Sequence, residues 1–173
     1  MIILLTGGSK CGKSRLAEQL TTRLAQGKPV HYLATMRVVD AADLEIVKRH
    51  QAYRAGKGFT VLERQRRLAS LALPENTILL LEDVPNLLAN EIFGGEGAQA
   101  ALEGIRHLMA ACRHLVLVTN EVGSDGIRYL PETQEYIQAL GALNQQLAGM
   151  AQVVIESVTG QMNVLKGALP WDS

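Results

Sequence analysis

The stretch that decides the fold is Gly7-Gly8-Ser9-Lys10-Cys11-Gly12-Lys13-Ser14, which matches the pattern G-x-x-x-x-G-K-[ST] at every fixed position. An apolar run at residues 2–6 precedes it and predicts a buried strand. Leucines at helical spacing follow it and predict a helix. This strand–loop–helix context favours a phosphate-binding loop over the alternative, a glycine-rich turn that binds nothing.

The residues of this loop have separate predicted roles. Gly7 and Gly12 carry no Cβ, so backbone N–H groups can turn inward toward phosphate oxygens, and the start of the next helix adds positive partial charge. We expect Lys13 to reach the β- and γ-phosphates and the Ser14 hydroxyl to ligate Mg²⁺. Lys10 is equally well explained as a surface lysine. The predicted nucleotide-binding loop is Gly7, Gly8, Ser9, Lys10, Cys11, Gly12, Lys13 and Ser14.

Composition places the chain among single-domain soluble proteins. Its 173 residues are 47% hydrophobic and 20% charged, and 17 basic residues balance 17 acidic ones, which gives no net field to attract nucleic acid. A cysteine inside the loop, Cys11, favours a reducing compartment. The N-terminal apolar run is too short for a signal peptide, and no stretch approaches the ~20 apolar residues of a membrane span. We therefore expect a cytoplasmic protein with neither a membrane span nor a nucleic-acid partner.

Strand and helix patterns alternate along the rest of the chain. Strands are expected at residues 30–35, 59–62, 78–83 and 114–119, and helices at residues 44–54, at residues 98–112 and from Pro131 onward. One or two helical turns are expected between residues 64 and 71. Residues 153–155 and 162–165 flank a turn and predict a terminal strand pair. The alternation predicts an α/β fold, a doubly wound and mainly parallel sheet with a P-loop NTPase core and a possible antiparallel terminal pair.

Acidic residues follow two of the expected strands. The run at residues 78–83 ends in Glu82 and Asp83, and Glu121 comes just after the run at residues 114–119. Ligands bind at the carboxyl ends of strands in such sheets, so the Glu82–Asp83 pair predicts a Mg²⁺ ligand. For Asp83 the alternative is a cap on a following helix. Glu121 could ligate Mg²⁺, bind a ribose hydroxyl or simply belong to a turn.

Five motifs occur in a fixed order: the loop, Tyr32-Leu33-Ala34-Thr35, His50-x-x-x-Arg54, Asn120-Glu121-Val122-Gly123 and Gly141-x-x-Asn144-Gln145. Over nearly the whole chain they resemble the bifunctional adenosylcobinamide kinase/adenosylcobinamide-phosphate guanylyltransferase family of cobalamin biosynthesis. The resemblance implies phosphorylation of adenosylcobinamide by a nucleoside triphosphate. It then implies transfer of GMP from GTP to the new phosphate, through a guanylyl-histidine. It also implies a homo-oligomer, a trimer with active sites between subunits.

The resemblance implies site residues at matching positions. His50 matches the guanylylated histidine, and Arg54 lies one helical turn away, where a guanidinium can stabilise charge on phosphorus. The alternative for His50 is a solvated histidine on a charged helix. ATP and GTP both remain open as phosphoryl donor, because no Asn-Lys-x-Asp motif is present. The predicted catalytic residues are His50, Lys13 and Arg54, the further nucleotide contacts are Thr35, Glu63 and Glu82, and the Mg²⁺ ligands are Ser14, Glu82 and Glu121.

The chain departs from the family pattern at several positions. Glu82 stands at the family acid, but Asp83 occupies the usual place of a cysteine, and Ile137-Gln138 replaces an Arg-Asp pair. Ile46 stands where the family has an arginine. These changes favour one alternative, a single-function small-molecule kinase that lacks guanylyl transfer. A non-catalytic nucleotide-binding regulatory protein is the second alternative.

Overall fold

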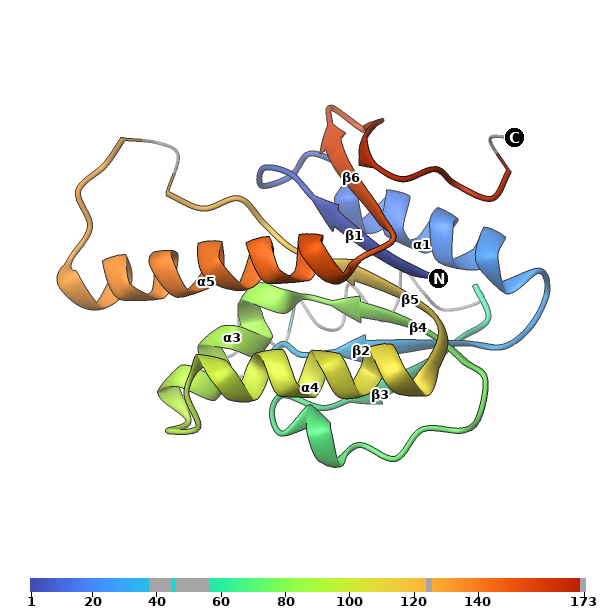
Figure 1. Cartoon of the computed structure of the whole chain (residues 1–173), viewed down its shortest axis with the longest axis horizontal. Helices are drawn as coiled ribbons and strands as arrows, with labels where there is room; N and C mark the ends of the chain where they lie inside the picture. The colour runs from blue at the N-terminus through green and yellow to red at the C-terminus, as the bar shows by residue number, and fades with distance from the viewer. Residues whose placement is uncertain (38–44, 46–56, 124–125, 172–173) are drawn as a thin grey trace.

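A mixed seven-stranded sheet forms the centre of the computed structural model, which describes residues 1–37, 45, 57–123 and 126–171 (Figure 1). Within these residues the strand order is β3-β2-β4-β5-β1-β6-β7, and every neighbouring pair is parallel except the antiparallel pair of β6 and β7. The strands are β1 (Ile2–Thr6), β2 (Val30–Ala34), β3 (Phe59–Glu63), β4 (Thr77–Glu82), β5 (Cys112–Val118), β6 (Val153–Val158) and β7 (Gln161–Lys166). The predicted α/β class, the parallel sheet and the antiparallel terminal pair are all confirmed.

Helices cover both faces of the sheet. The helix after the loop, α1, packs on one face, and three helices, α3, α4 and α5, pack on the other (Figure 1). A single 3-10 turn, η1, lies in the region where helical turns were expected. The expected helix at residues 44–54 lies outside the described residues, apart from Glu45. The bounds are α1 (Lys13–Ala25), η1 (Leu68–Ser70), α3 (Val84–Phe93), α4 (Ala98–Ala111) and α5 (Pro131–Met150).

The uninterrupted apolar strands are explained by burial on both faces. In β4, Leu80 faces the α1 side, whereas Leu79 and Leu81 face the side of α3, α4 and α5, and all three are 0% exposed. Side chains alternate across a strand, so a strand covered on both faces needs apolar residues at every position. Burial of each such leucine contributes about 1.5–3 kcal/mol of transfer free energy.

Helix α3 was expected only in the alternative for Asp83, a cap on a following helix, and its bounds were not predicted. It begins directly after β4, with Asp83 as its N-cap and Pro85 in its first turn. Both residue types are typical of a helix start. The predicted strand at residues 78–83 therefore ends one residue early, at Glu82. No helix in the described part of the chain is long and apolar enough to cross a membrane.

Candidate nucleotide site

The loop between β1 and α1 passes closely over the end of β6. Gly7 has a φ of 141°, and a Cβ at this position would lie 2.5 Å from the carbonyl oxygen of Ser157. Any other residue would clash there, so glycine is required by contact as well as by conformation. Gly12, with a φ of 95°, occupies the N-cap position of α1.

The turn between β6 and β7 supports the loop from one side. The Gly160 N–H donates to the carbonyl oxygen of Cys11 at 2.8 Å, and the Ser157 hydroxyl donates to the same oxygen at 3.1 Å. On the β5 side, the N–H of Glu121 donates to the carbonyl oxygen of Gly7 at 3.3 Å. The loop is thus fixed by two segments far away in sequence, and none of these three hydrogen bonds was predicted.

Lys13 lies over the loop and is only 7% exposed. Its Nζ donates to the carbonyl oxygen of Gly7 at 2.9 Å and to that of Gly8 at 2.5 Å, and it lies 3.7 Å from the Cys11 Sγ. The ammonium group is therefore held inside the loop whose N–H groups are predicted to face phosphate. A charge placed there can bind phosphate oxygens through charge-assisted hydrogen bonds.

Glu82 brings together side chains from three elements. Its Oε1 accepts a hydrogen bond from the Ser14 hydroxyl at the start of α1, and its Oε2 accepts one from the Tyr32 hydroxyl of β2 at 2.9 Å. Tyr32 belongs to one of the motifs, but no role was predicted for it. The available signal was the polar hydroxyl of Tyr32 within a largely buried strand.

The pair of Ser14 and Glu82 fits a magnesium site by donor chemistry. Mg²⁺ prefers oxygen ligands and commonly takes one or two from the protein, with the rest from phosphates and water. Among the described residues no group of three or more His, Cys, Asp or Glu side chains could hold a metal ion by itself. Ser14 and Glu82 would therefore hold Mg²⁺ together with the phosphates of a nucleotide.

Asp83 takes the alternative role foreseen for it, as a helix cap. Its Oδ1 accepts a hydrogen bond from the backbone N–H of Asn86 at 2.8 Å. Burial raises the pKa of its carboxyl group to about 6; the Asn86 N–H opposes this rise and the nearby Glu82 adds to it. The two adjacent acids therefore differ in their contacts, since only Glu82 binds the Ser14 hydroxyl.

Thr35 is fully buried and joins the ends of β2 and β4. Its hydroxyl donates to the carbonyl oxygen of Asp83 at 2.8 Å and accepts from the Asp83 N–H at 2.9 Å. Its own carbonyl oxygen accepts from the Asn90 Nδ2 at 2.7 Å. These contacts hold the backbone beside Glu82 in place. A direct contact between Thr35 and nucleotide stays a prediction.

Helix α3 also anchors the segment that follows Glu63. Asn90 donates to the carbonyl oxygen of Gln65 at 3.2 Å, and the fully buried Glu91 accepts from the N–H of Arg67 at 2.6 Å. Glu63 itself is exposed at the end of β3, in register with Ala34 of β2. Its position at the carboxyl edge is compatible with the predicted nucleotide contact.

The remaining predicted residues fall into two groups. Asn144 of α5, a motif residue with no predicted role, joins the helix to the end of β5, because it accepts from the Thr119 hydroxyl at 2.7 Å and donates to the carbonyl oxygen of Asn120 at 3.1 Å. Glu121 is exposed just beyond this point. His50 and Arg54 lie outside the described residues, so the structure does not place them relative to the loop.

The fold, the loop and the hydroxyl–carboxylate pair define a P-loop nucleotide-binding protein with an α/β sheet. A solved structure, the flagellar accessory protein FlaH from Methanocaldococcus jannaschii, is similar in fold: the TM-score is 0.52 and the identity 12%, over 96% of this chain and 78% of that one. A family model described as cobinamide kinase / cobinamide phosphate guanyltransferase matches residues 3–165. The chain therefore belongs to this family.

Curated relatives agree with the family match. The bifunctional adenosylcobalamin biosynthesis protein CobU of Escherichia coli (strain K12) is 34% identical over 179 residues, which cover 92% of this chain and 97% of that protein. The bifunctional adenosylcobalamin biosynthesis protein CobP of Pseudomonas aeruginosa (strain PAO1) is 29% identical over 170 residues, with 95% and 96% covered. The similarity extends over nearly the full length of each relative.

Proposed function

We propose that this chain phosphorylates adenosylcobinamide with a nucleoside triphosphate and then transfers GMP from GTP to the phosphate, which yields adenosylcobinamide-GDP for cobalamin biosynthesis. The observation that carries the proposal is the contact of Ser14 and Glu82 beside the Lys13 loop, in a member of the cobinamide kinase family. This arrangement supplies the parts that phosphoryl transfer needs, a phosphate cradle, a cation and a metal-binding pair.

In the kinase step the protein's contribution is to position groups and stabilise charge. Backbone N–H groups of the loop bind the phosphates, and the Lys13 ammonium exchanges its contacts with the Gly7 and Gly8 carbonyl oxygens for phosphate oxygens. Ser14 and Glu82 would hold Mg²⁺, and the ion would supply positive charge beside the transferring phosphoryl group. The substrate hydroxyl forms the new P–O bond as the bond to the leaving nucleoside diphosphate breaks.

In the guanylyl step His50 is the proposed nucleophile. A ring nitrogen of neutral His50 attacks the α-phosphorus of GTP, an N–P bond forms, and the bond to the β-phosphate breaks with release of pyrophosphate. A phosphate oxygen of adenosylcobinamide phosphate then attacks the same phosphorus and frees the imidazole. Arg54, four residues away, stabilises the negative charge that develops on the phosphoryl oxygens.

One observation favours the single-function kinase as a second candidate. Ile137 of α5 packs against the loop after β5, since a Cβ on Gly123 would lie 2.7 Å from the Ile137 Cγ2. An apolar side chain at this position offers no charge to a phosphate, whereas the family resemblance implies an arginine here. The kinase reaction depends on the phosphate-binding loop, whereas the isoleucine at position 137 bears on guanylyl transfer.

A product assay separates these candidates. Purified protein is incubated with adenosylcobinamide, Mg²⁺ and either ATP or GTP, and corrinoid products are resolved by chromatography. The proposal expects adenosylcobinamide phosphate, and adenosylcobinamide-GDP when GTP is present. The phosphate alone would indicate a single-function kinase. Nucleotide binding without any corrinoid product would indicate a regulatory protein.

Sedimentation of the same preparation measures the mass of the assembly and so tests whether the protein is a homo-oligomer, which the family resemblance implies to be a trimer.

A further inference from the structure

Helix α3 carries an exposed aromatic ring between two hollows. Phe93 is 73% exposed, although it lies at the end of a helix that is otherwise well packed. One hollow, of about 320 Å³, lies on the side of Met36 and Arg37, and the other, of about 360 Å³, lies against Thr133 at the start of α5. Phe93 lines both hollows, so the ring stands as a ridge between them.

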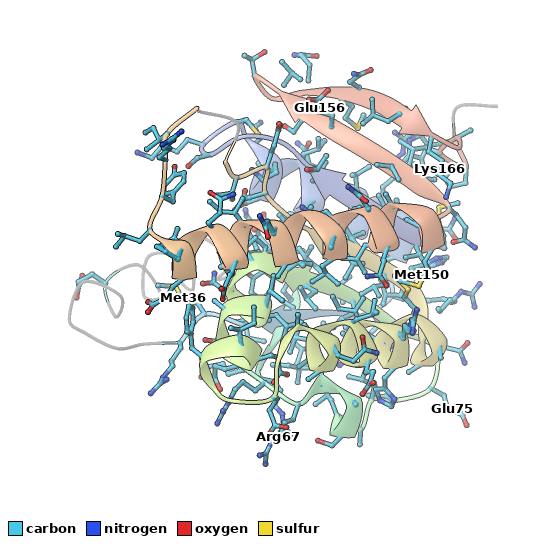
Figure 2. The ribbon with its side chains drawn as sticks, turned by 60° about the vertical axis from the view of Figure 1, so that its left-hand side comes forward. Met36, Arg67, Glu75, Met150, Glu156 and Lys166 are labelled. Atoms are coloured by element: carbon cyan, nitrogen blue, oxygen red, sulfur yellow. The ribbon has the colours of Figure 1, made fainter. Side chains whose placement is uncertain are left out.

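A single helix, α3, connects the nucleotide site to this ridge. Asp83, the cap of α3, directly follows Glu82, and Asn86, Ala89 and Phe93 then lie on one face at helical spacing. The distance along the axis from Asn86 to Phe93 is about 10 Å, from the rise of 1.5 Å per residue. Met36, labelled in Figure 2, lines the first hollow together with Asn86 and Phe93 of α3. A large ligand could therefore reach from the ridge to the loop.

Residues of β6 and of the β6–β7 turn contact the opposite side of the loop. The β6–β7 turn closes it there through the contacts of Gly160 and Ser157 with the Cys11 carbonyl oxygen. The α3 side carries surface of mixed character: the apolar Phe93 and Ala89, and the polar Asn86, Thr133 and Glu132 at the edges. Tyr136 is fixed at the base of the second hollow, because its hydroxyl donates to the carbonyl oxygen of Pro85 at 3.0 Å.

The substrate of the proposed reaction has complementary chemistry. The corrin of adenosylcobinamide has one face covered by the axial adenosyl group, a rim of amide groups, and its reactive hydroxyl at the end of a flexible arm. An aromatic ridge can contact a conjugated macrocycle face to face, while asparagine and threonine side chains exchange hydrogen bonds with amides. From this we infer that the corrin ring of the substrate lies on Phe93 across both hollows, with its arm directed along α3 to the loop. This inference rests on the proposed function.

Two variants test the site from opposite directions. Phe93→Ala removes the ridge, and Ala89→Phe fills space at the residue that the two hollows share with Phe93. Each should raise the KM for adenosylcobinamide about 10-fold or more and weaken its binding in equilibrium dialysis to a similar degree. The KM for the triphosphate should stay within twofold. Phe93→Tyr keeps the aromatic face and should bind corrinoid as the wild type does.

The matched control is Leu165→Ala on β7, which removes another exposed apolar side chain, 58% exposed, from a strand outside both hollows. It should change neither KM. Thermal unfolding shows that each variant is folded. The proposed site is wrong if the wild type is active and both α3 variants, Phe93→Ala and Ala89→Phe, bind corrinoid as tightly as the wild type. It is also wrong if Phe93→Ala changes only the sedimentation mass, which would make a second copy the occupant. A wild type that neither binds nor phosphorylates adenosylcobinamide overturns the proposed function, and this site with it.

Discussion

The Ser14 hydroxyl donates a hydrogen bond to Glu82, although the two residues lie 68 positions apart in the chain. The contact joins the first turn of α1 to the end of β4, two strands away from β1 in the sheet. It distinguishes between two neighbouring acids, because Asp83 instead caps α3. The oxygen pair of Ser14 and Glu82 is where we expect Mg²⁺ to bind with a nucleotide.

The first prediction compares the two acids. Glu82→Gln removes a charged oxygen ligand and should raise the Mg²⁺ concentration required for half-maximal turnover by about 10-fold or more, the cost of weakening one charge-assisted contact. Asp83→Asn keeps the cap and should raise it by less than about threefold. Turnover is measured across a Mg²⁺ titration at saturating triphosphate. A larger effect of Asp83→Asn would show that Asp83, and not Glu82, is the Mg²⁺ ligand.

The second prediction concerns the lysine over the loop. Lys13→Ala removes the ammonium group held by Gly7 and Gly8 and should lower turnover by roughly 10²–10³-fold, with weaker triphosphate binding. The far-ultraviolet circular dichroism should match the wild type. The control is Lys28→Ala, at an exposed lysine beyond the end of α1. Full turnover in a folded Lys13→Ala variant would refute the role of this residue.

The third prediction uses two adjacent glycines. Gly7→Ala places a Cβ 2.5 Å from the Ser157 carbonyl oxygen at a φ of 141°, and should lower the free energy of unfolding by about 2 kcal/mol or more. At Gly8, no atom of the described residues lies within 4 Å of an added Cβ, so Gly8→Ala should cost less than about 1 kcal/mol. Denaturant unfolding without nucleotide measures both, and equal losses would exclude the clash as the cause.

The fourth prediction is a pH dependence of stability. Burial raises the folded-state pKa of Asp83 to about 6, above its ordinary value of 3.8. The folded protein therefore binds the proton more tightly, and this favourable contribution is lost as pH rises from about 4 through 6. Asp83→Asn has no charge to bury. Its unfolding free energy relative to wild type should rise between pH 4 and pH 7, on the order of 1–2 kcal/mol. Urea titrations in EDTA at each pH measure this difference in unfolding free energy. A difference that stays constant from pH 4 to pH 7 would contradict the prediction.

The fifth prediction tests the covalent step. With Mg²⁺ and GTP labelled at the α-phosphate, the wild type should retain label that mild acid removes and base does not, as expected of a histidine phosphoramidate. GTP labelled at the γ-phosphate should leave none. His50→Ala should lose the label but keep nucleotide binding, and Arg54→Ala should slow labelling roughly 10²–10³-fold. If the wild type turns over triphosphate without retaining the label, the guanylyl step is wrong and the single-function kinase becomes the better assignment.

Much of the fold could be predicted because the signals are local. A strand covered on both faces is apolar at every position, as at residues 78–81, and turn residues mark where it stops. The antiparallel terminal pair was visible as two short apolar runs around a turn. Helix α3 was foreseen only through the alternative for Asp83, because this cap directly continues the preceding strand pattern and no loop separates the two elements.

The candidate site was only partly predictable. The loop pattern places Lys13 and Ser14 within one local segment, and Glu82 was preferred over Asp83 by family resemblance. The roles of Thr35 and Asn144 were not foreseen, because both bind backbone groups just beyond the ends of strands that are distant in sequence. Tyr32 was recognised as part of a motif, but its partner Glu82 could not be identified from the sequence. Such pairings depend on strand order, which a sequence pattern does not contain.

The sequence by itself determined the P-loop, the α/β class and the positions of most strands, because backbone conformation and burial follow from residues close together in the chain. Only the tertiary structure decided that Glu82 contacts Ser14, that Ser157 requires a glycine at position 7, and that Phe93 stands exposed between two hollows. These facts depend on which elements become neighbours. That arrangement is set by the packing of the whole sheet and its helices, and no short segment specifies it.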